Sequence, residues 1–417
     1  MKVCVVESAK FPSDQPFSTH AIQPAGMDFL DELGVGNKIR ERTAVVSKSR
    51  FSLGRAHVDV DFAPGREMHC PRRSLLDPVL QEAAIAAGAD FRPETAVLEL
   101  LRDGDRVAGV RTRHGGKMSE LRARIIIGAD GRHSTVARLV KAEQYLTQEF
   151  PRGGYWSYWP STTAFETLPF QTYIEIDGHQ ARFAFRCDGA LTIAGALDRP
   201  EAVRAWKPDI VSNIRRSLLA SKVIRLLVDG NEPVAPPVGL LKASGFFRVP
   251  VGPGWALVGD AGLHKDPTPG YGITDALRDA KSLSRAVLDG REAALELYWR
   301  ERDVKSLALF ANAQRMGSLE YANPFNELII AGINATPALR TRLRDVMDRK
   351  VSPFDVVPFW RIFAWTALAM VKGQTEIWPH FLESGKFGSW LGAELGRRKA
   401  LLEQVRGRIQ SQPSRAV

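Results

Sequence analysis

The segment 255–276 constrains the fold of this 417-residue chain more than any other part of it. A short apolar run, residues 255–258, predicts a buried strand because it ends abruptly in Gly259-Asp260. A loop rich in glycine and proline follows, and from Ile273 onward apolar residues recur at helical spacing. A carboxylate accepts hydrogen bonds from hydroxyl groups, and a helix start offers free N–H groups and a positive dipole. The segment is therefore expected to bind an anionic ligand that is rich in hydroxyl groups.

This segment resembles the second flavin-contacting motif of FAD-dependent oxidoreductases in the p-hydroxybenzoate hydroxylase-like superfamily. That superfamily includes aromatic hydroxylases, flavin-dependent halogenases and geranylgeranyl reductases. The carboxylate of the motif is suited to accept hydrogen bonds from the ribityl chain, and its glycines let the backbone approach the flat flavin ring. The resemblance implies that the FAD-binding residues include Gly259, Asp260, Pro267, Gly270, Gly272 and Ile273.

Two further motifs support the resemblance. Residues 123–138 resemble the superfamily's strand followed by Gly-Ala-Asp-Gly-x-x-Ser. Asp130 and Gly131 of this motif stand about 130 residues before Asp260, as in the superfamily. Residues 70–80 resemble the segment in which the superfamily carries an arginine, here Arg73, near the flavin and just ahead of a helix. Each match alone is a common turn sequence, but three in order and at family spacing argue against coincidence. Arg73, Asp130 and Gly131 therefore join the residues implied to bind FAD.

The N-terminal residues resemble a later part of the same fold. Residues 3–6 match its second strand and are followed by Glu7, in the position that binds the adenosine ribose. No Gly-x-Gly-x-x-Gly stands between a strand and a helix anywhere in the chain. The first strand, the phosphate-binding turn and the first helix are thus expected to be absent, through either a start codon assigned too late or a real deletion. Without the N–H groups of that turn, the chain as written is expected to bind FAD weakly.

The resemblance implies an α/β fold with an N-terminally truncated Rossmann-like FAD-binding domain, an inserted antiparallel β-sheet substrate domain and C-terminal helices. We expect residues 1–150 and 248–315 to form the two parts of the FAD-binding domain. Residues 151–247 are expected to form the substrate domain, with a sheet that roofs the substrate cavity, because runs of β-forming residues there are separated by Asp-Gly turns. Residues 316–417 are expected to be helical and to end in a basic tail.

Charge and cysteine usage exclude some classes of function. The chain carries 57 basic and 47 acidic residues, for a formal net charge of +10. These charges are interleaved, which argues against a nucleic-acid surface and indicates either attraction of anionic FAD and NAD(P)H or a solvated basic surface. The cysteines Cys4, Cys70 and Cys187 have neither metal-binding nor disulfide spacing, which fits a protein of the reducing cytoplasm without a metal site.

The longest apolar stretch near the C-terminus, residues 362–371, is too short to span a bilayer, which takes about 20 residues. No secretory signal peptide is visible at the N-terminus. The stretch has two interpretations. It is either an amphipathic surface helix that touches lipid, or, as we prefer, a helix packed on the flavin domain or in a homodimer interface.

The loop between Asp260 and Ile273, here called the glycine loop, and the motifs present or missing elsewhere in the chain narrow the reaction class. The spacing from Asp266 to Ala276 resembles the halogenase and geranylgeranyl reductase branch more than the aromatic hydroxylases, whose loop is longer. However, the halogenase Trp-x-Trp-x-Ile-Pro motif is missing, and residues 16–20 replace the Cys-Gly-Gly-Gly segment of the reductases. We therefore predict an FAD-dependent, NAD(P)H-using monooxygenase that hydroxylates a small hydrophobic or aromatic compound. The alternatives are a flavin-dependent reductase or dehydrogenase acting on a carbon–carbon double bond, and a flavin-less remnant with a binding role.

Catalytic residues are hard to assign, because the cofactor itself supplies most of the chemistry in such enzymes. His20 falls where the superfamily brings a loop close to the flavin ring, so it is a candidate donor of a proton or a hydrogen bond. The alternative is that His20 only shapes this loop. His264, in the glycine loop, is a further candidate.

Overall fold

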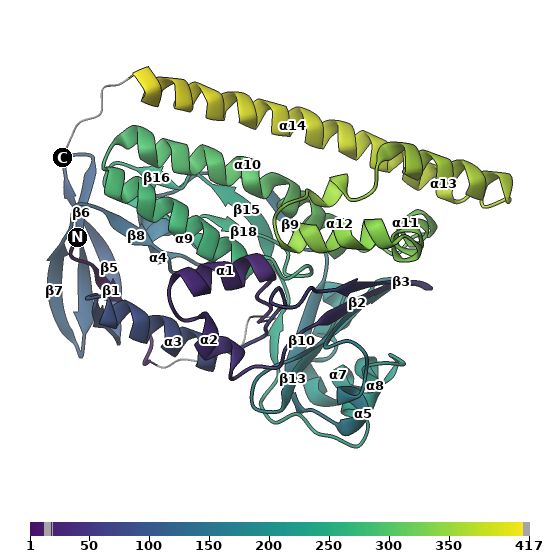
Figure 1. Ribbon diagram of the computed structural model, residues 1–417. Coiled ribbons are helices and arrows are strands. Elements are labelled where there is room, and N and C mark those ends of the chain that lie inside the picture. Colours follow the sequence, from purple (N-terminus) through teal and green to yellow (C-terminus); the bar gives the residue numbers. More distant parts are fainter. Residues whose placement is uncertain (12–17, 19, 412–417) are drawn as a thin grey trace.

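The computed structural model describes residues 1–11, 18 and 20–411 as a mixed α/β protein (Figure 1). Helix α14 (Ile377–Ser411) runs beside α10 (Glu292–Gly317) along one side of the molecule, and an antiparallel sheet lies on the other side. This arrangement confirms the predicted α/β class with an antiparallel sheet and C-terminal helices. No helix in the described ranges is long and apolar enough to cross a membrane.

The predicted flavin-binding part is built on two small sheets that each contain a parallel strand pair. β1 (Cys4–Val6) pairs with β4 (Asp90–Arg92), and β8 (Ile126–Gly128) pairs with β17 (Trp255–Leu257). An antiparallel strand, β16 (Val251–Gly252), edges the second sheet. Among the strands of the described residues, none joins β1 to β8. The predicted buried strand at 255–258 is thus present and central to its sheet.

Further strands and helices surround these sheets. Helix α9 (Gly272–Asp289) follows the glycine loop as predicted, and its Leu283 and Val287 pack on Ala256 of β17. It also packs against α10 and α1, which places the glycine loop between buried elements. The remaining elements of this part are α1 (Pro24–Glu32), α2 (Gly36–Arg40), α3 (Arg73–Ala86), β5 (Thr95–Asp103), β6 (Arg106–His114), β7 (Lys117–Arg122), α4 (Thr135–Leu139), β9 (Gln144–Glu149), β15 (Ser244–Arg248), η2 (Gly259–Ala261) and β18 (Leu263–His264).

A seven-stranded sheet, here called the roof sheet, has the strand order β14-β10-β13-β12-β11-β2-β3. All neighbouring strands are antiparallel except β11 and β2, and Gly54, with φ +52°, makes the tight turn between β2 and β3. Two strands therefore come from residues 48–61, within the range predicted for the FAD-binding domain. The strands are β2 (Lys48–Leu53), β3 (Ala56–Asp61), β10 (Gly153–Pro160), β11 (Thr172–Asp177), β12 (Gln180–Arg186), β13 (Leu191–Asp198) and β14 (Val238–Leu240).

The two faces of the roof sheet carry different neighbours because side chains alternate along each strand. On one face, Trp159 and Tyr173 pack against the helices of residues 200–228. On the other face, Phe183 and Phe185 pack toward residues that precede the flavin-binding helices, including Ala21. The helical elements on the first face are α5 (Thr163–Glu166), α6 (Pro200–Arg204), η1 (Lys207–Asp209), α7 (Ile210–Leu219) and α8 (Arg225–Val228).

The C-terminal region is helical, as predicted. Helices α11 (Pro324–Ala335) and α12 (Pro337–Met347) cover β3 (Figure 1), and η3 (Pro353–Asp355) precedes α13 (Phe359–Val371). α11 begins at a proline, and the preceding Asn323 accepts a hydrogen bond from a backbone N–H of its first turn. α13 packs on α11 and α14, while much of its opposite surface is exposed. The predicted apolar stretch is therefore a surface helix.

Candidate flavin site

Asp260 lies in η2, immediately after strand β17. The preceding Gly259 has φ +59°, a conformation that favours glycine, and it turns the chain sharply at the end of the strand. The Asp260 side chain is 43% exposed. Its Oδ2 lies 3.0 Å from Nδ1 of His264, and no hydrogen bond within the described residues uses Oδ1. One carboxylate oxygen is therefore held by the protein and the other remains available to a ligand.

His264 also affects the charge of Asp260. Burial raises the pKa of this carboxyl, but the hydrogen bond and charge of His264, together with Lys265 and Arg132, hold the pKa below its usual value. The His264 ring packs close to that of Phe150, with 5.6 Å between ring centroids. Asp260 is thus an ionised, oriented hydrogen-bond acceptor at neutral pH.

The glycine loop ends in an open helix start. Gly270 has φ +67°, and a Cβ built on it would approach the side chain of Ala21 at 3.2 Å. Gly272 is the first residue of α9, and a Cβ built on it would meet no atom within 4 Å. No side chain caps this helix. The first N–H groups of α9 therefore have no side-chain cap, and the space beside Gly272 is open to a ligand.

A buried charge network holds the start of α9 in place. Asp275 is only 2% exposed and lies 3.1 Å from Nζ of Lys265, 3.0 Å from Arg349 and 3.2 Å from Arg278. Burial raises the pKa of Asp275, but the three cations together lower it far below its usual value. The sequence offered one signal for this network, an acidic residue in the first turn of a helix. It offered none for Arg349, which lies 74 positions further along the chain.

The other two carboxylates predicted to bind FAD accept hydrogen bonds from residues that follow them closely in the chain. Glu7 stands at the end of β1, as predicted, and accepts a hydrogen bond from the N–H of Ala9 at 2.8 Å. Asp130 accepts one from the Ser134 hydroxyl and another from the N–H of Val136 at 3.1 Å. Asp130 therefore stabilises the start of α4, and Gly131, with φ +72°, makes the turn before it. A role of these residues toward FAD stays a prediction.

Arg73 and His20 lie near the roof sheet. Arg73 is the first residue of α3, where its side chain pairs with Asp77 at 2.6 Å. His20 is fully buried, and its Nε2 lies 2.7 Å from the hydroxyl of Tyr158 in β10. Burial, together with the charge of Arg73, lowers the pKa of His20 to about 3. This neutral, packed ring favours the interpretation that His20 shapes the loop.

The glycine loop and the roof sheet line the same cavity. Trp156 and Phe183 come from the roof sheet, whereas His264, Pro267 and Thr268 come from the glycine loop. No group of three His, Cys, Asp or Glu side chains in the described ranges is placed to hold a metal ion. All three cysteines are free. The cavity lined by the roof sheet and the glycine loop combines apolar walls with a few polar groups, which is typical of small-molecule sites.

Comparison with known proteins agrees with this geometry. A family model described as an FAD binding domain matches residues 1–172. The chain is 25% identical over 233 residues to digeranylgeranylglycerophospholipid reductase 2 from Methanococcoides burtonii, covering 53% of each protein. It thus spans about half the length of the curated reductases that it matches. It is also 25% identical over 332 residues to 6-methylpretetramide 4-monooxygenase from Streptomyces rimosus, covering 75% of this chain and 74% of that protein.

A solved structure shares the fold. The p-nitrophenol 4-monooxygenase from Pseudomonas putida DLL-E4 matches with a TM-score of 0.70 and 16% sequence identity. The match covers 85% of this chain and 93% of that chain. The strands and helices that carry the candidate site therefore share the fold of that structure.

Proposed function

We propose that this chain is an FAD-dependent monooxygenase of the p-hydroxybenzoate hydroxylase-like superfamily, a proposal supported by the match of residues 1–172 to an FAD binding domain. In this proposal it uses NAD(P)H to reduce its flavin and hydroxylates a small hydrophobic or aromatic compound. The observation that carries the proposal is the cavity shared by the glycine loop and the roof sheet. An apolar substrate in this cavity would lie next to the residues that would hold the flavin.

The residues present fit the ribityl chain and ring of FAD. Asp260 has one carboxylate oxygen that no described residue uses, and Gly272 leaves open space before α9. Asp260 would accept a hydrogen bond from a ribityl hydroxyl, and the N–H groups of α9 would face the electron-rich edge of the ring. Bound FAD supplies the redox chemistry. Trp156 and Phe183 would cover the substrate and exclude water from the reacting atoms.

NAD(P)H as the reductant is supported by the charge of the chain. The formal net charge is +10, so the protein attracts dinucleotides, which are anions. The test measures oxidation of NADPH and of NADH by the purified flavoprotein, with and without oxygen, in the presence of small aromatic compounds. A monooxygenase requires oxygen for substrate-dependent turnover and yields a hydroxylated product. Substrate-dependent turnover without oxygen would reject the monooxygenase and support a reductase.

A reductase acting on a carbon–carbon double bond is the second candidate. Its support is the match to a protein named digeranylgeranylglycerophospholipid reductase, although the two share only 25% identity. A third candidate, a flavin-less binding protein, predicts that FAD does not bind at all. Titration with FAD separates this last candidate from both enzymes.

A further inference from the structure

A cavity of about 240 Å³ lies between the roof sheet and the C-terminal helices. Apolar side chains from one face of the sheet form one wall, and apolar positions at helical spacing on α11 form another. Pro269 and Tyr271 of the glycine loop also line it, so the cavity reaches the candidate flavin site. We call it the apolar chamber, and its lining includes Phe51, Val58, Ile330, Ile333, Val346 and Val357.

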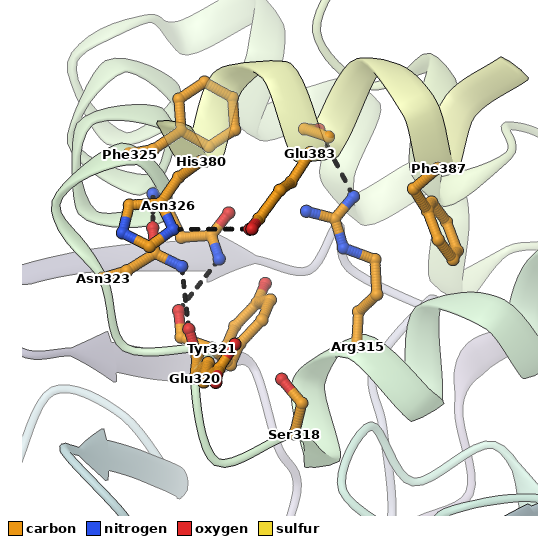
Figure 2. A pocket seen from close by; sticks show the side chains of 11 residues that line it. Arg315, Ser318, Glu320, Tyr321, Asn323, Phe325, Asn326, His380, Glu383 and Phe387 are labelled. Atoms are coloured by element: carbon orange, nitrogen blue, oxygen red, sulfur yellow. Dashed lines mark hydrogen bonds and ion pairs between the residues drawn. The ribbon is translucent and has the colours of Figure 1, made fainter. Parts of the chain in front are cut away.

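A second cavity of about 260 Å³, drawn in Figure 2, adjoins the apolar chamber. The two share part of their lining, namely Arg315, Tyr321, Phe325, Asn326 and Ser384. Most of the residues that line the second cavity have polar side chains, and we call it the polar vestibule. The remaining residues of the vestibule are Ser318, Glu320, Asn323, His380, Glu383 and Phe387.

Arg315 stands at the junction of the two cavities. It extends from α10 toward α14 (Figure 2), where its guanidinium contacts Ser384 and the ring of Phe387. Its one hydrogen bond among the described residues is long, 3.5 Å from Nη1 to Oγ of Ser384. The guanidinium also lies 5.0 Å from the centre of the Phe387 ring, a weak cation–π contact. No carboxylate of the described chain comes within 4.0 Å of it.

Three of the four arginines that are buried in the described ranges, Arg182, Arg302 and Arg398, pair with a carboxylate, whereas Arg152 donates to backbone carbonyls. Arg182 lies 2.7 Å from Glu175, and Arg302 lies 2.8 Å from Asp303. Such pairing is expected, because a buried charge is costly unless an opposite charge and hydrogen bonds compensate it. Burial also lowers the pKa of the Arg315 guanidinium, an effect that Tyr321 opposes. Arg315 is therefore a half-buried cation that pairs with no carboxylate among the described residues.

The acids of the polar vestibule do not compensate this cation. Glu383 turns toward His380, 3.7 Å away (Figure 2), and its side chain is 70% exposed. Glu320 is exposed as well. A guanidinium with free donors is suited to a planar or tetrahedral anion, such as a carboxylate or a phosphate.

We propose that Arg315 and the apolar chamber together bind an amphiphile, with its anionic head on Arg315 and its apolar body in the chamber. The head is a carboxylate or a phosphate monoester, and the body is an unbranched or branched hydrocarbon. The chamber reaches Pro269 and Tyr271, so such a compound would approach the candidate flavin site. Its role as the substrate rests on the function proposed above, whereas its binding does not.

The test compares three ligands that share one chain and differ in the head: decanoate, decyl phosphate and 1-decanol. Their affinities for the purified protein are measured by titration calorimetry without any turnover. We expect both anions to bind at least about tenfold more tightly than the alcohol, and Arg315→Gln to abolish that difference while leaving 1-decanol unchanged. The order of the two anions identifies the head, carboxylate or phosphate. Equal affinity for anion and alcohol in the unaltered protein would overturn the proposal.

Two variants test the parts of this site separately. Ile333→Phe fills the apolar chamber and should weaken all three ligands alike, while Glu383→Gln removes a negative charge from the vestibule and should tighten only the anions. Arg285→Gln, on the exposed surface of α9, is the matched control and should change nothing. If Arg315 only packs on Phe387, Arg315→Gln lowers the melting temperature but keeps the preference for anions, and the proposal fails. FAD affinity, measured on the same samples, reports on the proposed function independently.

Discussion

Nδ1 of His264 lies 3.0 Å from Oδ2 of Asp260, within the loop that joins β17 to α9. The imidazole orients the carboxylate and keeps its pKa low against the effect of burial. A contact between residues four positions apart thus prepares Asp260 to accept a hydrogen bond from a ligand. His264 acts here through another residue and is a positioning residue.

We predict that His264→Ala shifts the pH at which FAD binding is lost. Because the pKa of Asp260 is lowered in the folded protein, its ionised form persists as pH falls until that lowered pKa is reached. Without His264, only Lys265 and Arg132 oppose the effect of burial, so the pKa of Asp260 rises and FAD affinity is lost at a higher pH. FAD titrations between about pH 4 and 7 measure this shift. His57→Ala, at an exposed position of β3, is the control. Identical pH profiles for His264→Ala and the control would contradict the role.

Gly272→Ala is predicted to separate ligand binding from stability. A Cβ at this position meets no atom, so the free energy of unfolding should stay unchanged or rise by about 0.4–1 kcal/mol, as for other compatible glycine substitutions. The same methyl group would enter the space assigned to the flavin and lower FAD affinity by about tenfold or more. Gly385→Ala, also with open space around it, should leave FAD affinity unchanged. Equal FAD affinity in both variants would place the flavin elsewhere.

His20 is predicted to make the protein less stable in mild acid. Its pKa is lowered from 6.5 to about 3, so between these values the unfolded chain binds a proton that the folded chain does not. The free energy of unfolding should therefore fall as pH falls, by at most about 1.4 kcal/mol per pH unit. Urea denaturation at about pH 7 and about pH 5 measures the difference. His20→Gln should reduce this dependence, and an unchanged slope in the variant would reject the assignment.

The exposed surface of α13 is predicted to bind lipid. Phe359 is 67% exposed, Trp360 64% and Phe363 52%, and large exposed apolar surfaces of this kind mark interaction sites. The nearby cations Arg361 and Lys372 complement an anionic bilayer, which is why we propose lipid as the partner. Trp360→Ala combined with Phe363→Ala should abolish co-sedimentation with phosphatidylglycerol vesicles. Loss of a dimer in sedimentation analysis, without vesicle binding by the parent protein, would instead support a homodimer interface.

The local pattern of the chain predicted the elements of the site well. The strand at 255–258, the helix after Gly272 and the strands of the roof sheet follow from periodicity and turn residues, which are local signals. The pairing of β2 with β11 was not predictable, because a parallel contact between distant segments leaves no local pattern. Arg349 and Arg315 were missed for the same reason. The role of Arg349 depends on its ion pair with Asp275, and that of Arg315 on the lack of a paired carboxylate among the described residues. Both depend on contacts between distant segments of the chain.

The most direct measurement is the FAD affinity of Asp260→Ala, determined by fluorescence titration of a form of the protein that holds flavin. Asp289→Ala, at the far end of α9, serves as the control. Asp260→Ala removes a charge-assisted hydrogen bond and leaves a ribityl hydroxyl unpaired, a loss of about 1.5–3 kcal/mol. We predict that affinity falls by roughly ten- to hundredfold while the control is unchanged. An Asp260→Ala protein with unaltered flavin content and affinity would contradict the assignment of this loop as the flavin site.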